Sequence, residues 1–229
     1  MKNKKVLVVG GSFGIGLTVA KQAQGHGAYV IIASRNTTER KKELLQELPE
    51  ESIDLYDLDI TSSSAQNDLF AQISEIDHLV ITVKPEISSA PFQETSVQEA
   101  KEAFETKLWG AYQLIQAAQP FIAENGSIIL TSGIAGEKIF RGASTIALIN
   151  SATETLGRSL AVELAPVRVN VVSPGFVKPK PQALQNMANN FPVPRLASPD
   201  EIASAYLRLM ENQYVTGTVT VVDGGATLI

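Results

Sequence analysis

The chain has 229 residues, 44% of them hydrophobic, and a formal net charge of −5 at pH 7. A chain of this length can bury one sizeable core, so we expect a single domain over residues 1–229. The basic residues are scattered and cluster only at Arg40-Lys41-Lys42, which argues against a nucleic-acid partner or a membrane surface. The absence of cysteine excludes disulfides and cysteine metal sites.

Two sequence features favour a cytoplasmic location. No apolar run reaches the length of about 20 residues that a membrane-spanning helix needs. The first five residues lead directly into a predicted strand, so we expect no signal peptide. His26 lies at a predicted helix C-terminus and His78 begins a predicted strand, and we interpret both as structural rather than as metal ligands.

Apolar runs alternate with amphipathic stretches along the whole chain. Strands are predicted at residues 5–9, 28–33, 52–57, 77–82, 126–131, 167–172 and 218–222. Helices are predicted at residues 15–25, 37–47, 63–74, 96–122, 145–163 and 199–210. Apolar strands separated by helices are typical of a parallel sheet covered on both faces. We therefore predict an α/β fold, a single-domain, Rossmann-like, doubly wound parallel sheet of about seven strands with ligands at their carboxyl ends.

The segment from Val6 to Gly16 is the most informative part of the chain. Its apolar residues predict a short buried strand, Gly10 and Gly14 then break that strand, and an apolar-periodic helix follows. Glycine lets the backbone turn tightly and approach a pyrophosphate, and a helix N-terminus offers free N–H groups. The alternative is that the glycines form only a turn. The strand-to-helix context favours nucleotide binding.

Polar residues follow the second and third predicted strands. In a dinucleotide-binding fold, the end of the second strand meets the adenosine ribose, and an acidic residue there holds the 2′-hydroxyl of NAD. This chain has Ser34, Arg35 and Asn36 instead, and a hydroxyl with a guanidinium suits a 2′-phosphate. The alternative is that Arg35 is a solvated loop residue. Asp59 can either accept from the adenine amino group or cap the next helix.

Serines and prolines mark the boundaries of the later elements. Ser62 to Ser64 offer an N-cap for the third helix, and Ser198 precedes Pro199 at the start of the last one. Residues 176–195 fit no regular element and are rich in proline. We interpret this segment as a loop that forms a substrate lid.

Several motifs resemble those of the short-chain dehydrogenase/reductase family. They are Gly10 to Gly16, Leu58-Asp59-Ile60, Val167 to Gly175, Tyr214 to Gly217 and Val222 to Gly225. The resemblance covers nearly the whole chain and implies an oxidoreductase with a nicotinamide cofactor and a small-molecule substrate. Ser34 and Arg35 then favour NADP(H) over NAD(H). The resemblance also implies a homotetramer or homodimer, packed through the helices predicted at 96–122 and 145–163.

The same resemblance assigns cofactor-binding residues along the chain. They are Gly10, Ser12, Phe13, Gly14, Ile15, Gly16, Ser34, Arg35, Asn36, Asp59, Ile60, Thr82, Val83, Lys107, Asn150, Pro174, Gly175 and Val177. Most of these residues follow the carboxyl ends of predicted strands, where a doubly wound sheet binds its ligands.

The catalytic residues of the family are an asparagine, a serine, a tyrosine and a lysine, and all four differ here. The neighbouring segments place Lys107 at the asparagine position and Gly133 at the serine position. Ile146 stands at the tyrosine position and Asn150 at the lysine position. The chain therefore resembles an atypical member that lacks the Tyr-x-x-x-Lys pair.

Lysine and asparagine have changed places between positions 107 and 150. In the family these positions face each other across adjacent helices, so the exchange would keep one ammonium and one amide in the same pocket. We expect Lys107 to reach the nicotinamide ribose or the substrate, and Ser132 to act at the substrate oxygen. The alternative is a surface lysine, or an ion pair between Lys107 and a residue such as Glu105.

Two functions fit these features. One is an NADP(H)-dependent oxidoreductase of carbonyls or alcohols with a rearranged active site, in which Lys107 and Ser132 stabilise charge at the substrate oxygen. The other is a non-catalytic NADP(H)-binding protein that senses redox state or works through partners. The exchange between Lys107 and Asn150 favours the enzyme, because a polar function has been kept and moved between helices.

Overall fold

The computed structural model describes residues 1–229 and is organised around one seven-stranded parallel sheet. The strands are β1 (Lys5–Val9), β2 (Tyr29–Ser34), β3 (Ile53–Asp57), β4 (Ile76–Ile81), β5 (Ile122–Thr131), β6 (Arg168–Pro174) and β7 (Val219–Val222). Their order across the sheet is β3-β2-β1-β4-β5-β6-β7, so the winding reverses between β1 and β4. The prediction of a doubly wound α/β sheet is confirmed.

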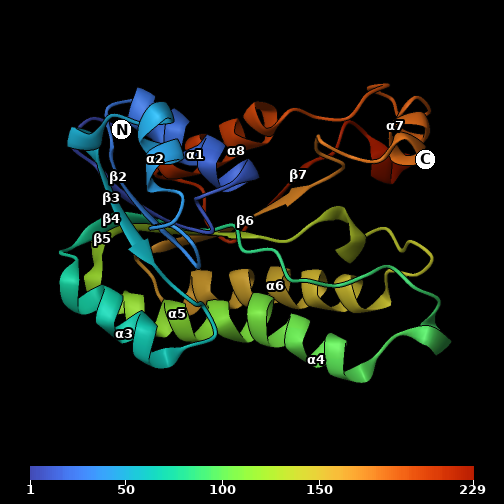
Figure 1. Ribbon diagram of the computed structural model, residues 1–229, viewed down its shortest axis with the longest axis horizontal. Helices are drawn as coiled ribbons and strands as arrows, with labels where there is room; N and C mark the ends of the chain where they lie inside the picture. Colours follow the sequence, from blue (N-terminus) through green and yellow to red (C-terminus); the bar gives the residue numbers. More distant parts are fainter.

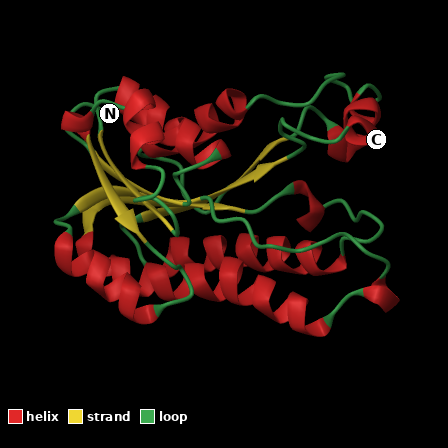
Figure 2. Cartoon of the chain, viewed as in Figure 1, coloured by secondary structure: helices red, strands yellow, loops and turns green.

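Helices cover both faces of this sheet. They are α1 (Gly14–Gly25), α2 (Lys41–Glu47), α3 (Ser63–Gln72), α4 (Val97–Phe104), α5 (Gly110–Ala118), α6 (Ser144–Glu163), α7 (Gln182–Ala188) and α8 (Pro199–Glu211). Helices α1, α2 and α8 lie on one face and α3 to α6 on the other (Figure 1). Figure 2 shows the sheet enclosed between these two helical layers. None of the helices combines the length and apolar character needed to cross a membrane.

The two faces of the sheet bury two separate cores. Val6 and Val8 point into a core of 22 buried residues, which α1 and α8 complete. Leu7 and Val9, which alternate with them along β1, point into a core of 21 buried residues on the side of α3 and α5. Because both faces are covered, the strands read as continuous apolar runs, which is why the sequence pattern predicted them well.

The helix predicted at residues 96–122 is interrupted by a π-helical turn and ends earlier than predicted. Helix α4 passes into a π-helical turn, η3 (Glu105–Trp109), and α5 then continues to Ala118. A π turn holds one more residue per turn than an α-helix, and this turn buries both Lys107 and Leu108. Pro120 lacks the N–H that would continue α5, so β5 begins at Ile122, earlier than predicted.

The segment 176–195, expected to be an irregular loop, contains helix α7. It also has a small core of its own, in which Ala188 and Phe191 pack with Ile134 from the loop after β5 and Ala226 from the C-terminus. The rings of Phe176 and Phe191 stack with centroids 5.7 Å apart. This segment is therefore packed against two other parts of the chain, a contact that its local sequence does not reveal.

The two predicted serine caps are present, and one predicted helix start is wrong. Ser62 Oγ accepts from the Ala65 N–H at the start of α3, and Ser198 forms a capping box with Glu201 at the start of α8. Both caps were predicted. Helix α2 begins at Lys41 rather than at Thr37, because the Thr37 hydroxyl donates to the Ser34 carbonyl and holds a turn there.

Candidate functional site

The turn between β1 and α1 has an open backbone cradle at the carboxyl end of β1. Gly10 and Gly14 have φ values of +82° and +55°, which favour glycine. A Cβ on Gly16 would collide with the Gly10 carbonyl and the Thr82 hydroxyl. No side chain caps the N-terminus of α1, and its first turn contains no acidic residue. The cradle therefore has the free N–H groups and the positive helix end that suit a phosphate.

Ser34 and Thr82 hold this turn in place from the two neighbouring strands. The Ser12 N–H donates to Ser34 Oγ at 3.2 Å, which ties the turn to the end of β2. Thr82 Oγ1, just after β4, lies 3.1 Å from the Val9 carbonyl and 3.2 Å from the Gly10 carbonyl. Thr82 lies at the reversal point of the sheet, between β1 and β4, where doubly wound folds bind their ligands.

Two arginines flank the glycine turn, and the sequence drew attention to only one of them. Arg35 extends into solvent, 64% exposed, and pairs with Glu86 at 2.9 Å. Arg40, just before α2, donates from Nη1 to the Ser12 carbonyl and lies 5.7 Å above the centre of the Phe13 ring. Arg40 was expected to lie inside the helix predicted at residues 37–47, with Lys41 and Lys42. It contacts the cradle because α2 starts late and its preceding turn folds back.

Asp59 does not cap α3, so that alternative was wrong. Its Oδ1 accepts from both the N–H and the hydroxyl of Thr61, at 2.9 and 2.8 Å, and Ser62 is the cap instead. These two hydrogen bonds hold the pKa of Asp59 below its usual range. The second oxygen of the carboxylate makes no contact with a protein donor.

Lys107 is buried with its ammonium pointing into the protein, and only 8% of the residue is exposed. Its Nζ donates to Asn150 Oδ1 at 2.7 Å and to the Ser132 carbonyl at 3.0 Å. The expected proximity of Lys107 and Asn150 is confirmed, and a surface lysine or a pair with Glu105 is excluded. Burial lowers the pKa of Lys107 to about 8, because water no longer stabilises the charge.

Asn150 joins this lysine to the loop that follows β5. Its Nδ2 donates to the Gly133 carbonyl at 3.1 Å, so both ends of the amide are engaged. A Cβ added at Gly133 would lie 3.0 Å from the same Nδ2. A serine side chain at position 133 would therefore press on the amide that now holds Lys107.

The Ser132 side chain, which was expected to act at the substrate oxygen, has a protein partner in the structure. The residue is 4% exposed, and its hydroxyl donates to Glu154 Oε1 at 2.9 Å, inside the layer between β5 and α6. Only the Ser132 backbone carbonyl faces Lys107. Glu154, one turn after Asn150 on α6, was not singled out from the sequence, because a glutamate in a long helix is usually solvated.

Known proteins resemble this chain over its whole length. A family model described as Enoyl-(Acyl carrier protein) reductase matches residues 10–227. A short-chain dehydrogenase/reductase, ATR9 of Stachybotrys chlorohalonatus, is 31% identical over 100% of this chain and 98% of its own length. The 3-oxoacyl-[acyl-carrier-protein] reductase FabG of Chlamydia muridarum is also 31% identical, over 97% of each chain.

The solved structure of a small-chain dehydrogenase in complex with NADPH is 31% identical, covers 100% of both chains and has a TM-score of 0.83. The chain belongs to the short-chain dehydrogenase/reductase family. It is an oxidoreductase of that family, whose members use NAD(P)(H).

The other residues assigned to the cofactor in this short-chain dehydrogenase/reductase take several environments. Phe13 is 69% exposed beside the cradle, and Asn36 is exposed and donates to Glu39. Ile60 is a core residue, whereas Ile15 and Val83 are half-buried.

The end of β6 holds the remaining three assigned residues. Pro174 pairs with Val222 of β7, and the Gly175 N–H donates to the Val222 carbonyl. A Cβ on Gly175 would lie 2.8 Å from Asp223, so the two segments approach closely here. Val177 forms a single parallel bridge with Ala197, which holds both ends of the segment 176–195 together.

None of the five tyrosines forms a hydrogen bond with Lys107, Asn150 or Ser132. Tyr206 is fully buried on α8, and its hydroxyl lies 2.7 Å from Thr131 Oγ1. Burial raises the pKa of Tyr206 above its usual range. Ile146 is half-buried on α6 and has no proton to transfer.

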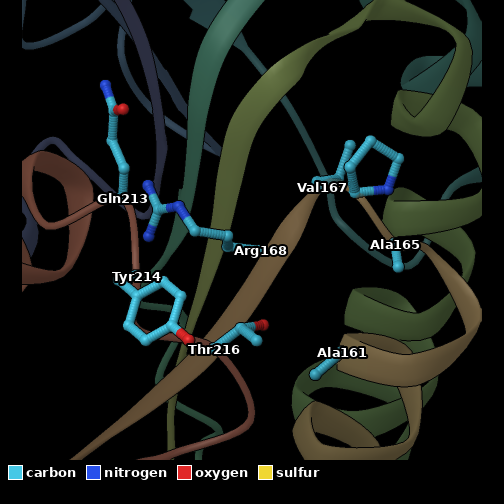
Figure 3. Close-up of a pocket in the computed structure, with 8 residues that line it drawn as sticks. Ala161, Ala165, Val167, Arg168, Gln213, Tyr214 and Thr216 are labelled. Atoms are coloured by element: carbon cyan, nitrogen blue, oxygen red, sulfur yellow. The ribbon is translucent and has the colours of Figure 1, made fainter.

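A separate hollow lies at the opposite end of the sheet, where β6 begins (Figure 3). Tyr214 and Thr216 line it together with Arg168, whose guanidinium donates to the carbonyls of Leu209 and Met210. The guanidinium is therefore engaged with the end of α8. This hollow lies at the amino end of β6, whereas the cradle lies at the carboxyl end of β1. The two sites share no residue.

Proposed function

We propose that this protein is an NADP(H)-dependent oxidoreductase of carbonyls or alcohols with a rearranged active site. The observation that carries the proposal is the 2.7 Å hydrogen bond between Lys107 Nζ and Asn150 Oδ1. It joins the two positions at which the family's asparagine and lysine have been exchanged. The protein would thus be an atypical member that lacks the Tyr-x-x-x-Lys pair and keeps an ammonium and an amide in one buried cluster.

The residues around the glycine turn fit a dinucleotide phosphate. The backbone N–H groups at the start of α1 have no side-chain cap, and the first turn of α1 has no acidic residue to oppose an anion. Arg40 lies against the turn and Arg35 lies near it, in an exposed ion pair that a phosphate can replace. These two charges support NADP(H) over NAD(H), as does the NADPH complex of a similar protein.

When bound, NADPH supplies the hydride. Lys107 has three N–H donors, and two of them point at Asn150 and the Ser132 carbonyl. The third remains for the substrate oxygen or the nicotinamide ribose. Because its pKa is about 8, Lys107 is mostly protonated at neutral pH and can still give up a proton, as a general acid must.

The segment 176–195 is the part of the chain that we assign to the substrate. It follows β6 directly, so it starts at the carboxyl edge of the sheet, as the cradle does. Its small core with Ile134 and Ala226 gives it a defined position there. Such a packed segment would exclude water from the reacting atoms, as an active-site lid does.

Lys107→Met tests the proposal, because methionine fills the volume of the lysine without its charge. We expect NADPH oxidation with a panel of aldehydes, ketones and quinones to fall about 100-fold or more, the range for a lost general acid. Lys101→Met, on the exposed surface of α4, is the matched control and should keep wild-type rates. Equal rates for Lys107→Met and wild type would refute the role of Lys107.

A non-catalytic NADP(H)-binding protein is the second candidate, and one observation favours it. Ile146 occupies the position of the family's proton donor, and no tyrosine hydroxyl bonds to the Lys107 cluster. The same panel separates the two candidates. Tight NADPH binding by the wild type, without turnover of any carbonyl, would favour the sensor over the enzyme.

A further inference from the structure

We propose that Glu154 is a positioning residue, a buried carboxylate that acts through Ser132 to keep the Lys107 ammonium charged and aimed at Asn150. The inference deepens the proposed function and rests on it, since it assigns a role behind Lys107 in the same site. It gives this site a negatively charged partner that the exchange of lysine and asparagine alone does not include.

The geometry links Glu154 to Lys107 through one residue. Glu154 lies four residues after Asn150 on α6, so the two side chains share a face of that helix. The Ser132 hydroxyl donates to Glu154 Oε1 at 2.9 Å, while the Ser132 carbonyl accepts from Lys107 Nζ at 3.0 Å. Ser132 therefore touches the cation with its backbone and the anion with its side chain. A movement of the carboxylate would move the carbonyl that orients the ammonium.

The charges around this cluster are few. Helix α5 contains no charged residue, and the charged residues of α4 are exposed. On α6, Glu154 has a side chain only 12% exposed, and Arg158 lies 3.9 Å behind it with more than half of its side chain in solvent. Glu154 is therefore the buried charge that faces Lys107, and Arg158 offsets it only weakly through water.

The two influences on Lys107 oppose each other. Burial lowers the pKa of the ammonium, and the negative charge of Glu154 raises it again. A neutral residue at position 154 should let burial act alone. The pKa of Lys107 should then fall below about 8, and less of the lysine would stay charged at neutral pH.

Glu154→Gln tests this directly, with Glu163→Gln on the exposed end of the same helix as the matched control. The pKa of Lys107 is followed by NMR of protein labelled with carbon-13 at the lysine side chains, with the signal assigned by its loss in Lys107→Met. We expect the pKa to fall by about one pH unit, a tenfold weaker proton affinity, in Glu154→Gln only. An unchanged Lys107 titration in Glu154→Gln would overturn the inference.

Ser132→Ala provides a second test in case Glu154→Gln does not fold. It keeps both charges and removes the hydrogen bond that holds the carboxylate, so the Lys107 pKa should change by about half a pH unit or more. Ser173→Ala is its control, because the Ser173 hydroxyl is buried and has no hydrogen-bond partner. Identical Lys107 titrations in the two variants would also overturn the inference.

The titration also separates this inference from the proposed function. A lower Lys107 pKa in Glu154→Gln supports the role of Glu154 whatever the rate of NADPH oxidation. If Lys107→Met then keeps turnover and NADPH binding at wild-type levels, Glu154 positions Lys107 as inferred, and Lys107 itself is not catalytic.

Discussion

At the scale of single residues, the buried lysine decides what the site can do. Lysine is almost never buried without partners, and Lys107 has two acceptors within 3.0 Å on two other elements. The lowered pKa follows from that burial and makes the ammonium a proton donor near neutral pH. A solvated lysine would hold its proton too firmly for this role.

The pKa of Lys107 predicts a pH profile. Reduction of a carbonyl needs the protonated ammonium, so kcat/KM should fall as the pH rises through about 8, where Lys107 loses its proton. Stopped-flow measurement of NADPH oxidation between pH 6 and about 9.5 checks this. A kcat/KM that rises across that range would show that Lys107 is not the proton donor.

The two arginines predict the choice of cofactor. Arg40→Ala and Arg35→Ala should each weaken NADPH binding about tenfold or more, because a charge-assisted contact contributes roughly 1.5–3 kcal/mol. NADH binding should change little, since it lacks the 2′-phosphate. Isothermal titration calorimetry with both cofactors measures this, with the exposed Lys42→Ala as control. Equal affinities of the wild type for NADPH and NADH would contradict the prediction.

At the scale of elements, the close contacts between strand ends shape the cradle. Gly16 leaves no room for a side chain between the Gly10 carbonyl and the Thr82 hydroxyl, so β1, α1 and β4 meet there without a gap. Close packing of this kind makes the cradle rigid. Less conformational entropy is therefore lost when a phosphate binds there.

Gly16→Ala should therefore weaken NADPH binding by about tenfold or more, because the added methyl group displaces the turn. Gly25→Ala is the matched control on the same helix, since a Cβ there meets nothing within 4 Å. Fluorescence titration of NADPH against both variants gives the comparison. An unimpaired Gly16→Ala variant would mean that the phosphate lies elsewhere.

A buried contact between His78 on β4 and Ser127 on β5 predicts that the folded state loses stability in acid. His78 Nδ1 lies 2.8 Å from Ser127 Oγ, and burial lowers the pKa of His78 to about 4. The unfolded chain takes up this proton near pH 6.5, so the folded state loses stability as the pH falls from about 6.5 towards 4. The free energy of unfolding should drop by roughly 2 kcal/mol between pH 7 and pH 5 from this residue.

Urea unfolding at the two pH values measures the loss, and His78→Gln removes the titrating group. Between pH 7 and pH 5, the free energy of unfolding of the variant should drop less than that of the wild type. The difference between the two drops is the contribution of His78, roughly 2 kcal/mol. If both proteins lose the same stability, His78 does not cause the acid sensitivity.

At the scale of the whole molecule, one helical layer carries exposed apolar side chains. Trp109 is 46% exposed and Tyr112 39% exposed at the junction of η3 and α5, and Leu148 and Val162 on α6 are 62% and 79% exposed. Large apolar residues gathered on two neighbouring helices favour an interface between copies. The proposed homodimer or homotetramer would cover them.

Leu148→Glu should disrupt this assembly, since it places a charge in an apolar contact. We expect sedimentation velocity to show a dimer or tetramer for the wild type at micromolar concentration and smaller species for the variant. A wild-type protein that sediments as a monomer would contradict the proposed oligomer.

The sequence by itself determined the class of fold and the place of the glycine cradle. The strands, the glycine turn and the serine caps at Ser62 and Ser198 depend on residues close together in the chain, so local patterns predict them. The contact between Lys107 and Asn150 was also predicted, because a resemblance to a known family places the two helices side by side. Without that resemblance, a spacing of 43 residues would have given no sign of the contact.

Only the tertiary structure decided the directions of the side chains and the exact ends of several elements. Ser132 turns its hydroxyl to Glu154, Arg40 reaches the cradle, and α7 forms within a proline-rich segment. The π turn at η3 that buries Lys107 was likewise not predicted from the sequence. Each of these outcomes depends on which distant residue lies opposite in the folded chain. Burial and hydrogen bonding to those distant partners outweigh the weak local preferences that a sequence pattern records.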